Sequence, residues 1–65
     1  MERLRRFLSE SEMTQAELAR HLGVTQPSVW EWVNGHSKPS ADRLVELSSV
    51  TGIPIDELLK DEAAA

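Results

Sequence analysis

Apolar residues recur at the spacing of helix turns in two neighbouring segments of the chain, residues 14–22 and 26–34. In each segment they form one stripe on an otherwise polar surface, and this pattern predicts two short amphipathic helices. The residues of the two stripes are Leu18, Ala19, Leu22, Val29, Trp32 and Val33. We therefore expect both helices to pack against a common core through these side chains.

The residues around these stripes are those that begin and end helices. Thr14 can accept a hydrogen bond from the first turn of its helix, and Glu17, three residues later, completes a capping box. Gly23 suits the left-handed backbone conformation that often follows a helix. Thr25 can cap the second helix, and Pro27 lies in its first turn, where the missing N–H is harmless. Two helices joined by so tight a turn form a helix-turn-helix.

The apolar stripes of the remaining chain predict three further helices, one before the motif and two after it. The first spans residues 2–10, and Ser40 caps the helix that follows the motif. Residues 61–65 are acidic, or alanine, and are expected to fray. The chain is therefore predicted to fold as one all-α domain over residues 1–65, with five short helices around a single core.

The composition limits the classes of protein to which the chain can belong. A chain of 65 residues buries only about 60% of the surface of its unfolded form, so its stability is modest. It has no cysteine, which excludes disulfides and thiolate metal sites. No apolar run approaches the roughly 18 residues of a membrane span, and no signal peptide is visible. We expect a soluble cytoplasmic domain that contacts no membrane.

The net charge of −4 is unevenly distributed along the chain. Residues 1–43 contain six basic and six acidic side chains, whereas residues 44–65 contain one basic and five acidic side chains. The excess negative charge therefore lies in the C-terminal third, outside the helix-turn-helix. Because the local potential at the docking face governs nucleic-acid binding, this balance does not exclude DNA as a partner, but it predicts modest affinity per domain.

Residues 14–35 resemble the helix-turn-helix of the Cro/cI-type repressors and regulators of phages and bacteria. The residues that carry the resemblance are Thr14, Gln15, Glu17, Leu18, Ala19, Leu22, Gly23, Val24, Thr25, Gln26, Val29, Trp32, Gly35 and Pro39. The similarity extends over about residues 4–60. It implies a compact lambda-repressor-like fold and a transcriptional regulator, typically a repressor, that binds double-stranded DNA sequence-specifically. It also implies a homodimer on a palindromic operator, because one such domain covers only one half-site.

In a helix-turn-helix protein the second helix lies in the major groove, with its N-terminal residues at the base edges. At 100° per residue, the side opposite its buried stripe carries Pro27, Glu31 and Asn34, with Gln26 and Trp30 at the edges. The residues predicted to read bases are Gln26, Pro27, Trp30 and Glu31. Gln26 can pair with N6 and N7 of adenine, and the resemblance implies the same role. Glu31 either accepts from N4 of cytosine or merely faces solvent.

The other two candidates for base reading are apolar. Trp30 stands where the family usually has a small polar residue, and three roles are open to it. It can pack on the surface of its own domain, contact a DNA sugar or thymine methyl, or bind a protein partner. Pro27 can offer only apolar contact, for example to a thymine methyl.

Phosphate contacts are expected at both ends of the motif. Thr14 and Gln15 open the first helix, where free N–H groups and the helix dipole favour an anion. The resemblance implies that Gln15 binds a phosphate. Around the other end of the motif, the residues that can hold further phosphates are Ser28, Asn34, Gly35, His36 and Lys38.

Other chemistry has little support in the sequence. His21 and His36 are fifteen residues apart with no third ligand at metal spacing. No Gly-rich phosphate loop or nucleophile motif is present, so we expect no enzyme, metal, cofactor or small-molecule ligand. The serious alternative to DNA binding is a protein-interaction or dimerisation module derived from a helix-turn-helix, such as an antitoxin-like partner. The expected dimer surface is the fourth helix together with residues 53–59.

Overall fold

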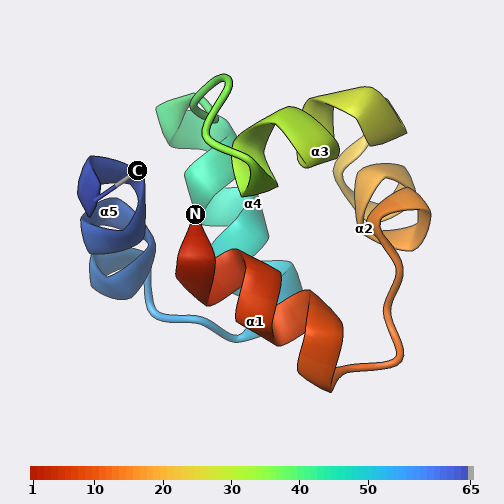
Figure 1. Ribbon diagram of the computed structural model, residues 1–65, viewed down its shortest axis with the longest axis horizontal. Helices are drawn as coiled ribbons and strands as arrows, with labels where there is room; N and C mark the ends of the chain where they lie inside the picture. The colour runs from red at the N-terminus through yellow and green to blue at the C-terminus, as the bar shows by residue number, and fades with distance from the viewer. Residues whose placement is uncertain (65) are drawn as a thin grey trace.

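The computed structural model describes residues 1–64 and confirms an all-α fold with a helix-turn-helix. Within these residues the helices are α1 (Glu2–Glu10), α2 (Gln15–Leu22), α3 (Gln26–Val33), α4 (Ala41–Thr51) and α5 (Ile55–Ala64) (Figure 1). The motif consists of α2 and α3, which pack directly on each other. α1 packs on α3 and α5, and α4 packs on α2 and α5, so that α1 and α4 join the motif to the C-terminal helix.

Residues close in sequence determine where α2 begins and where it ends. The Thr14 hydroxyl accepts from the Glu17 N–H at 3.1 Å, and the Glu17 carboxylate accepts from the Thr14 N–H at 3.2 Å. This reciprocal pair is the predicted capping box. Gly23 has φ of 69°, the left-handed conformation that favours glycine at the end of a helix. The connection to α3 is therefore tight, and the two helices of the motif are held at a fixed angle.

The core takes apolar side chains from every helix and from the segments beside them. These side chains belong to Met1, Leu4, Leu18, Ala19, Leu22, Val29, Trp32, Val33, Leu44, Leu47, Ile53 and Leu58. Both predicted stripes of the motif lie within this set, and Trp32 is only 6% exposed. The core thus fixes which side of α3 faces outward.

The C-terminal residues differ from their prediction. The expectation that the chain frays from residue 61 is wrong for residues 61–64, because α5 continues to Ala64. Asp61 is 9% exposed, and its carboxylate accepts hydrogen bonds from the N–H groups of Arg3 at 2.9 Å and Leu4 at 3.2 Å. These contacts hold the last turns of α5 against the start of α1. Residue 65 lies outside the described residues.

Part of the expected dimer surface is also corrected. Ile53 and Leu58 are buried in the core of the single chain and therefore cannot form a contact with a second copy. The large apolar side chains that stay exposed on the two C-terminal helices are Val45 at 62%, Leu59 at 51% and Ile55 at 39%.

Leu47→Ala tests the core. Leu47 is fully buried, so removing its side chain leaves a cavity and should lower the free energy of unfolding by about 2–5 kcal/mol. Val45, two residues earlier on the same helix, is mostly exposed. Val45→Ala should therefore change the free energy of unfolding by less than about 0.5 kcal/mol. Urea titrations followed by tryptophan fluorescence measure both values. Equal effects of the two substitutions would contradict this core.

Candidate nucleic-acid interface

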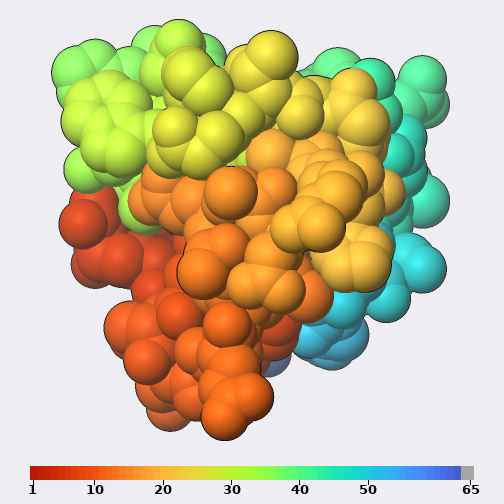
Figure 2. Space-filling view, turned by 90° about the vertical axis from the view of Figure 1, so that its right-hand side faces the viewer, coloured from red at the N-terminus to blue at the C-terminus, as the bar shows by residue number. Residues whose placement is uncertain are grey.

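One surface of the domain is formed by α2 and α3 together, and Figure 2 shows these two helices side by side on it. Val29, Trp32 and Val33 of α3 face inward. The residues predicted to read bases lie on the opposite side, which we call the outer face of α3 and define as Gln26, Pro27, Trp30 and Glu31. Three of the four are exposed and Glu31 is half-buried.

A hydrogen bond between two glutamines joins the starts of the two motif helices. Nε2 of Gln26 donates to Oε1 of Gln15 at 2.7 Å. This bond leaves Gln26 with its amide oxygen and one N–H, which is the pair of groups that adenine N6 and N7 require. It leaves Gln15 with a free NH₂ group, a donor to an anion. The contact therefore restricts both side chains and leaves free the polar groups that the predicted roles need.

The N-terminus of α2 lies beside this pair. The Thr14 hydroxyl oxygen accepts from the Glu17 N–H, so its own O–H and the N–H groups of Gln15 and Ala16 are left for an external acceptor. Together with the Gln15 amide they form a group of donors at the positive end of the helix dipole. The arrangement suits a phosphate oxygen.

Several predicted phosphate contacts instead have partners inside the protein. The Asn34 amide donates to the carbonyl of Trp30 at 2.9 Å and accepts from Arg5 at 3.2 Å. The Gly35 N–H donates to the Trp32 carbonyl at 3.3 Å. Both residues thus help to end α3, and their contribution to DNA contacts stays a prediction.

The remaining candidates differ in how free their polar groups are. The Ser28 hydroxyl lies 2.9 Å from the Thr25 hydroxyl, at the cap of α3. His36 and Lys38 follow α3 in an exposed loop. The backbone N–H of His36 donates to the Glu31 carbonyl at 2.8 Å, and its imidazole packs against the ring of Trp30. Lys38 takes part in none of the ion pairs between described residues.

Trp30 is 44% exposed and packs partly on its own domain. Its ring lies against that of His36, with centroids 5.1 Å apart and planes inclined by 31°. The contact agrees with the first of the three roles open to Trp30. The exposed part of the indole remains accessible on the outer face of α3.

Arg43 has a structural partner that the sequence did not reveal. Its guanidinium donates to the Leu22 carbonyl at 2.7 Å and pairs with Glu46 at 3.1 Å. It therefore stabilises the C-terminal end of α2. Three basic residues in and after the motif form no ion pair with another described residue, namely Arg20, Lys38 and Lys60, and Lys60 lies on α5. The positive potential of this surface is small.

Arg5 is a second residue that sequence reasoning missed. It lies on α1, outside the motif, and contacts both Val33 and Asn34 at the end of α3. No local pattern points to it, because the contact depends on how α1 packs against α3.

Residues 1–64 contain neither a cluster of metal ligands nor a membrane-spanning helix. No three histidine, aspartate or glutamate side chains of this range come together as metal ligands. None of its helices is both long enough and apolar enough to cross a membrane.

Comparison with known families identifies the class of protein. The sequence profile of the helix-turn-helix family HTH_3 matches residues 2–58, which is most of the chain. The chain belongs to this family, and the resemblance to Cro/cI-type regulators is confirmed. No solved structure matches the chain.

Three similar proteins carry names of transcriptional regulators. The chain is 29% identical over 62 residues to the uncharacterized HTH-type transcriptional regulator YqaE of Bacillus subtilis, covering 95% of this chain and 53% of that protein. It is 31% identical over 61 residues to the HTH-type transcriptional activator BcrR of Enterococcus faecalis. This match covers 94% of this chain and 30% of that protein. It is 40% identical over 43 residues to an uncharacterized HTH-type transcriptional regulator of Haemophilus influenzae. This match covers 66% of this chain and 18% of that protein. The chain thus spans about half the length of these relatives or less.

Trp30→Phe tests the placement of the two tryptophans. It leaves Trp32 as the one tryptophan of the chain, and its indole is almost completely buried. The emission maximum should therefore shift to shorter wavelength, and acrylamide should quench the remaining fluorescence much less than in the unchanged protein. Quenching of the variant as strong as that of free indole would contradict the described burial.

Proposed function

We propose that this chain is a sequence-specific, double-stranded DNA-binding domain of a transcriptional regulator, with α3 in the major groove. The observation that carries the proposal is the hydrogen-bonded pair of Gln15 and Gln26, which lies between an exposed helix face and a free helix N-terminus. Membership of the helix-turn-helix family supports the same docking geometry. Because bacterial and phage DNA lie in the cytoplasm, we infer that the protein acts there.

In this complex the Gln15–Gln26 pair reads one base and binds one phosphate at the same time. Gln26 accepts from N6 of adenine and donates to N7, while its second N–H stays on Gln15. Gln15 donates its own NH₂ group to the neighbouring phosphate. The backbone contact therefore positions the base-reading side chain.

The rest of the outer face supplies selectivity. Glu31 accepts from N4 of cytosine and disfavours bases that present only acceptors. Pro27 and the exposed edge of Trp30 contact thymine methyl groups. Phosphate contacts come from Thr14 and Gln15 at one end of the motif and from the loop with His36 and Lys38 at the other.

The small positive potential of one domain favours binding as a homodimer. Two domains on a palindromic operator, with half-site centres about 34 Å apart, add their contacts. The exposed apolar side chains of Val45, Ile55 and Leu59 are the candidates for the contact between copies. We infer repression, because a bound dimer blocks the DNA that it covers.

The second candidate function is a protein-interaction module. The observation that favours it is the exposed indole of Trp30, since tryptophan is frequent at the centre of protein interfaces. Under this alternative, Trp30→Ala abolishes partner binding, and substitution of Gln26 changes nothing measurable.

Titration with DNA at several salt concentrations separates these two functions. Duplex DNA from the region upstream of the gene is added to the protein, and binding is followed by tryptophan fluorescence. The logarithm of the binding constant should fall linearly with the logarithm of salt concentration, with a slope of about −0.9 for each phosphate contacted. Scrambled DNA of equal length is the control for sequence reading. The absence of binding at low salt would overturn the DNA-binding proposal.

Gln26→Ala tests base reading. The substitution should weaken binding to the operator by about 1–3 kcal/mol and remove the preference at one base position. Binding to scrambled DNA should change little, because no phosphate contact of Gln26 is lost. Competition with operators substituted at each position in turn measures the effect. An unchanged base preference would contradict the role of Gln26.

Lys38→Met tests backbone contact. It should weaken binding to operator and scrambled DNA alike and reduce the magnitude of the salt slope by about 1. The matched control is Lys60→Met, which removes the same charge from an exposed position on α5, distant in sequence from the motif. Equal loss of affinity in both variants would indicate a general effect of net charge in place of a specific contact.

A further inference from the structure

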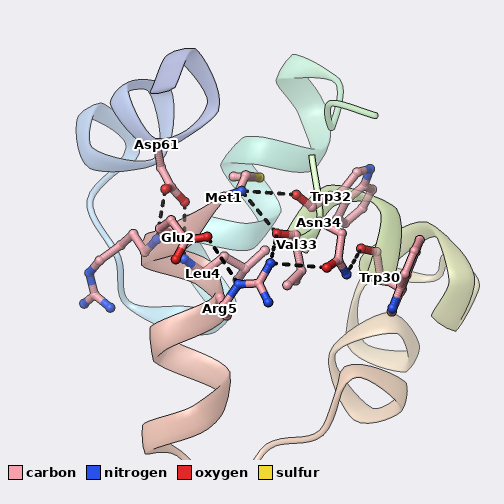
Figure 3. A network of polar contacts seen from close by, with 10 residues as sticks. Met1, Glu2, Leu4, Arg5, Trp30, Trp32, Val33, Asn34 and Asp61 are labelled. Carbon is pink, nitrogen blue, oxygen red and sulfur yellow. Dashed lines mark hydrogen bonds and ion pairs between the residues drawn. The ribbon is translucent and has the colours of Figure 1, made fainter. Parts of the chain in front are cut away.

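Two helix ends in this domain are bound by polar groups from other parts of the chain. α1 begins without a side-chain cap from its own first residues, and α3 ends without a basic residue in its last turn. These are unfavourable ends, because first-turn N–H groups need acceptors and C-terminal carbonyls favour nearby cations. Both ends are satisfied by other helices, and Figure 3 shows the contacts.

The start of α1 is capped by α5. The two carboxylate oxygens of Asp61 accept separately, Oδ1 from Arg3 N–H at 2.9 Å and Oδ2 from Leu4 N–H at 3.2 Å. Asp61 is nearly buried, so the carboxylate has lost most of its water and depends on these donors. Asp61 therefore fixes where α1 begins.

The end of α3 is held by α1. The Met1 nitrogen lies 3.4 Å from the Trp32 carbonyl and 3.3 Å from the Val33 carbonyl. Arg5 donates to the Val33 carbonyl and to the Asn34 amide oxygen, both at 3.2 Å. These donors from α1 lie against the negative end of α3 and complete the hydrogen bonding of its last turn.

We propose that Asp61 and Arg5 are positioning residues for DNA recognition: Asp61 sets the position of α1, and Arg5 on α1 sets the position of α3. The proposal rests on the proposed function, in which α3 enters the major groove. Neither residue belongs to the outer face of α3. In Figure 1, α5 and the motif lie on opposite sides of α1. DNA affinity therefore depends on a contact between the first and last helices of the domain.

DNA affinity depends on these contacts because base reading tolerates only small displacements of the polar groups involved. Polar groups that recognise a ligand must be held within roughly 0.5 Å and 10–20° of the required geometry. Gln26 lies at the start of α3, so a small rotation of the helix about this end moves Trp30 and Glu31 relative to the base edges. The Gln15–Gln26 bond anchors one end of α3, and the contacts with Arg5 and Met1 anchor the other.

The experiment compares two charge-removing variants with matched controls. Arg5→Met is paired with Arg6→Met, since Arg6 has the same charge on the same helix and its ion pair among the described residues is with Glu10, within α1. Asp61→Asn is paired with Asp56→Asn, an exposed aspartate on α5. Thermal unfolding first identifies a temperature at which every variant is folded, and operator binding is measured there. Asp61→Asn keeps one acceptor oxygen, so it preserves folding better than Asp61→Ala.

Arg5→Met and Asp61→Asn should each raise the Kd for the operator by about three- to tenfold, and both controls by less than about twofold. The salt slope should stay unchanged, because no phosphate contact is lost. The double variant should lose less than the product of the two single effects, because both residues act through α1. A folded Asp61→Asn protein with unchanged Kd would overturn the proposal. So would a salt slope reduced by about 1 in Arg5→Met, since Arg5 would then contact DNA directly.

A measurement without DNA keeps this proposal separate from the proposed function. Backbone amide chemical shifts of Trp30, Trp32 and Val33 should move in Asp61→Asn and stay in place in Asp56→Asn. Unmoved shifts in α3 would overturn the positioning role even if the protein binds DNA. Moved shifts in a protein that binds no DNA would leave the link between α5 and α3 established and would overturn only the DNA-binding function.

Discussion

The arrangement of this domain depends on how the unpaired backbone groups at the helix ends find partners. Helices of eight to eleven residues are not stable alone, and each end leaves several N–H or C=O groups without a partner in its own helix. α2 and α4 use neighbours in sequence, with Thr14 and Ser40 as caps. α1 and α3 use residues from other helices. Because a contact between helices satisfies backbone groups and restricts orientation together, these two ends hold the motif in place.

This division also explains how much of the fold could be predicted. The capping box of Thr14 and Glu17, the turn at Gly23 and the buried side of α3 follow from residues within four positions of one another. The sequence alone predicts fraying at Asp61, because nothing near it in sequence shows what it contacts. Its partners, Arg3 and Leu4, lie 58 and 57 residues away.

Prediction of the candidate site from the sequence has the same limit. Its outer face could be predicted, because burial of Trp32 and its neighbours determines which side of α3 remains exposed. Which polar groups on it are free could not be predicted. Asn34 has the spacing of a DNA contact, yet both ends of its amide have partners within the domain. The pairing of Gln15 with Gln26 likewise depends on the angle between α2 and α3, which periodicity does not specify.

The Asn34–Gly35 step also exposes this surface to a chemical change once the end of α3 opens, because the folded domain hydrogen-bonds both the Gly35 N–H and the Asn34 amide. Asparagine followed by glycine is prone to deamidation: the Gly35 nitrogen attacks the Asn34 side-chain carbonyl carbon, ammonia leaves, and hydrolysis of the succinimide gives aspartate or isoaspartate. The product lacks the N–H that Asn34 donates to the Trp30 carbonyl. It also places a negative charge at the negative end of α3. Ageing of the purified protein would therefore damage the junction of α1 and α3 while leaving the apolar core intact.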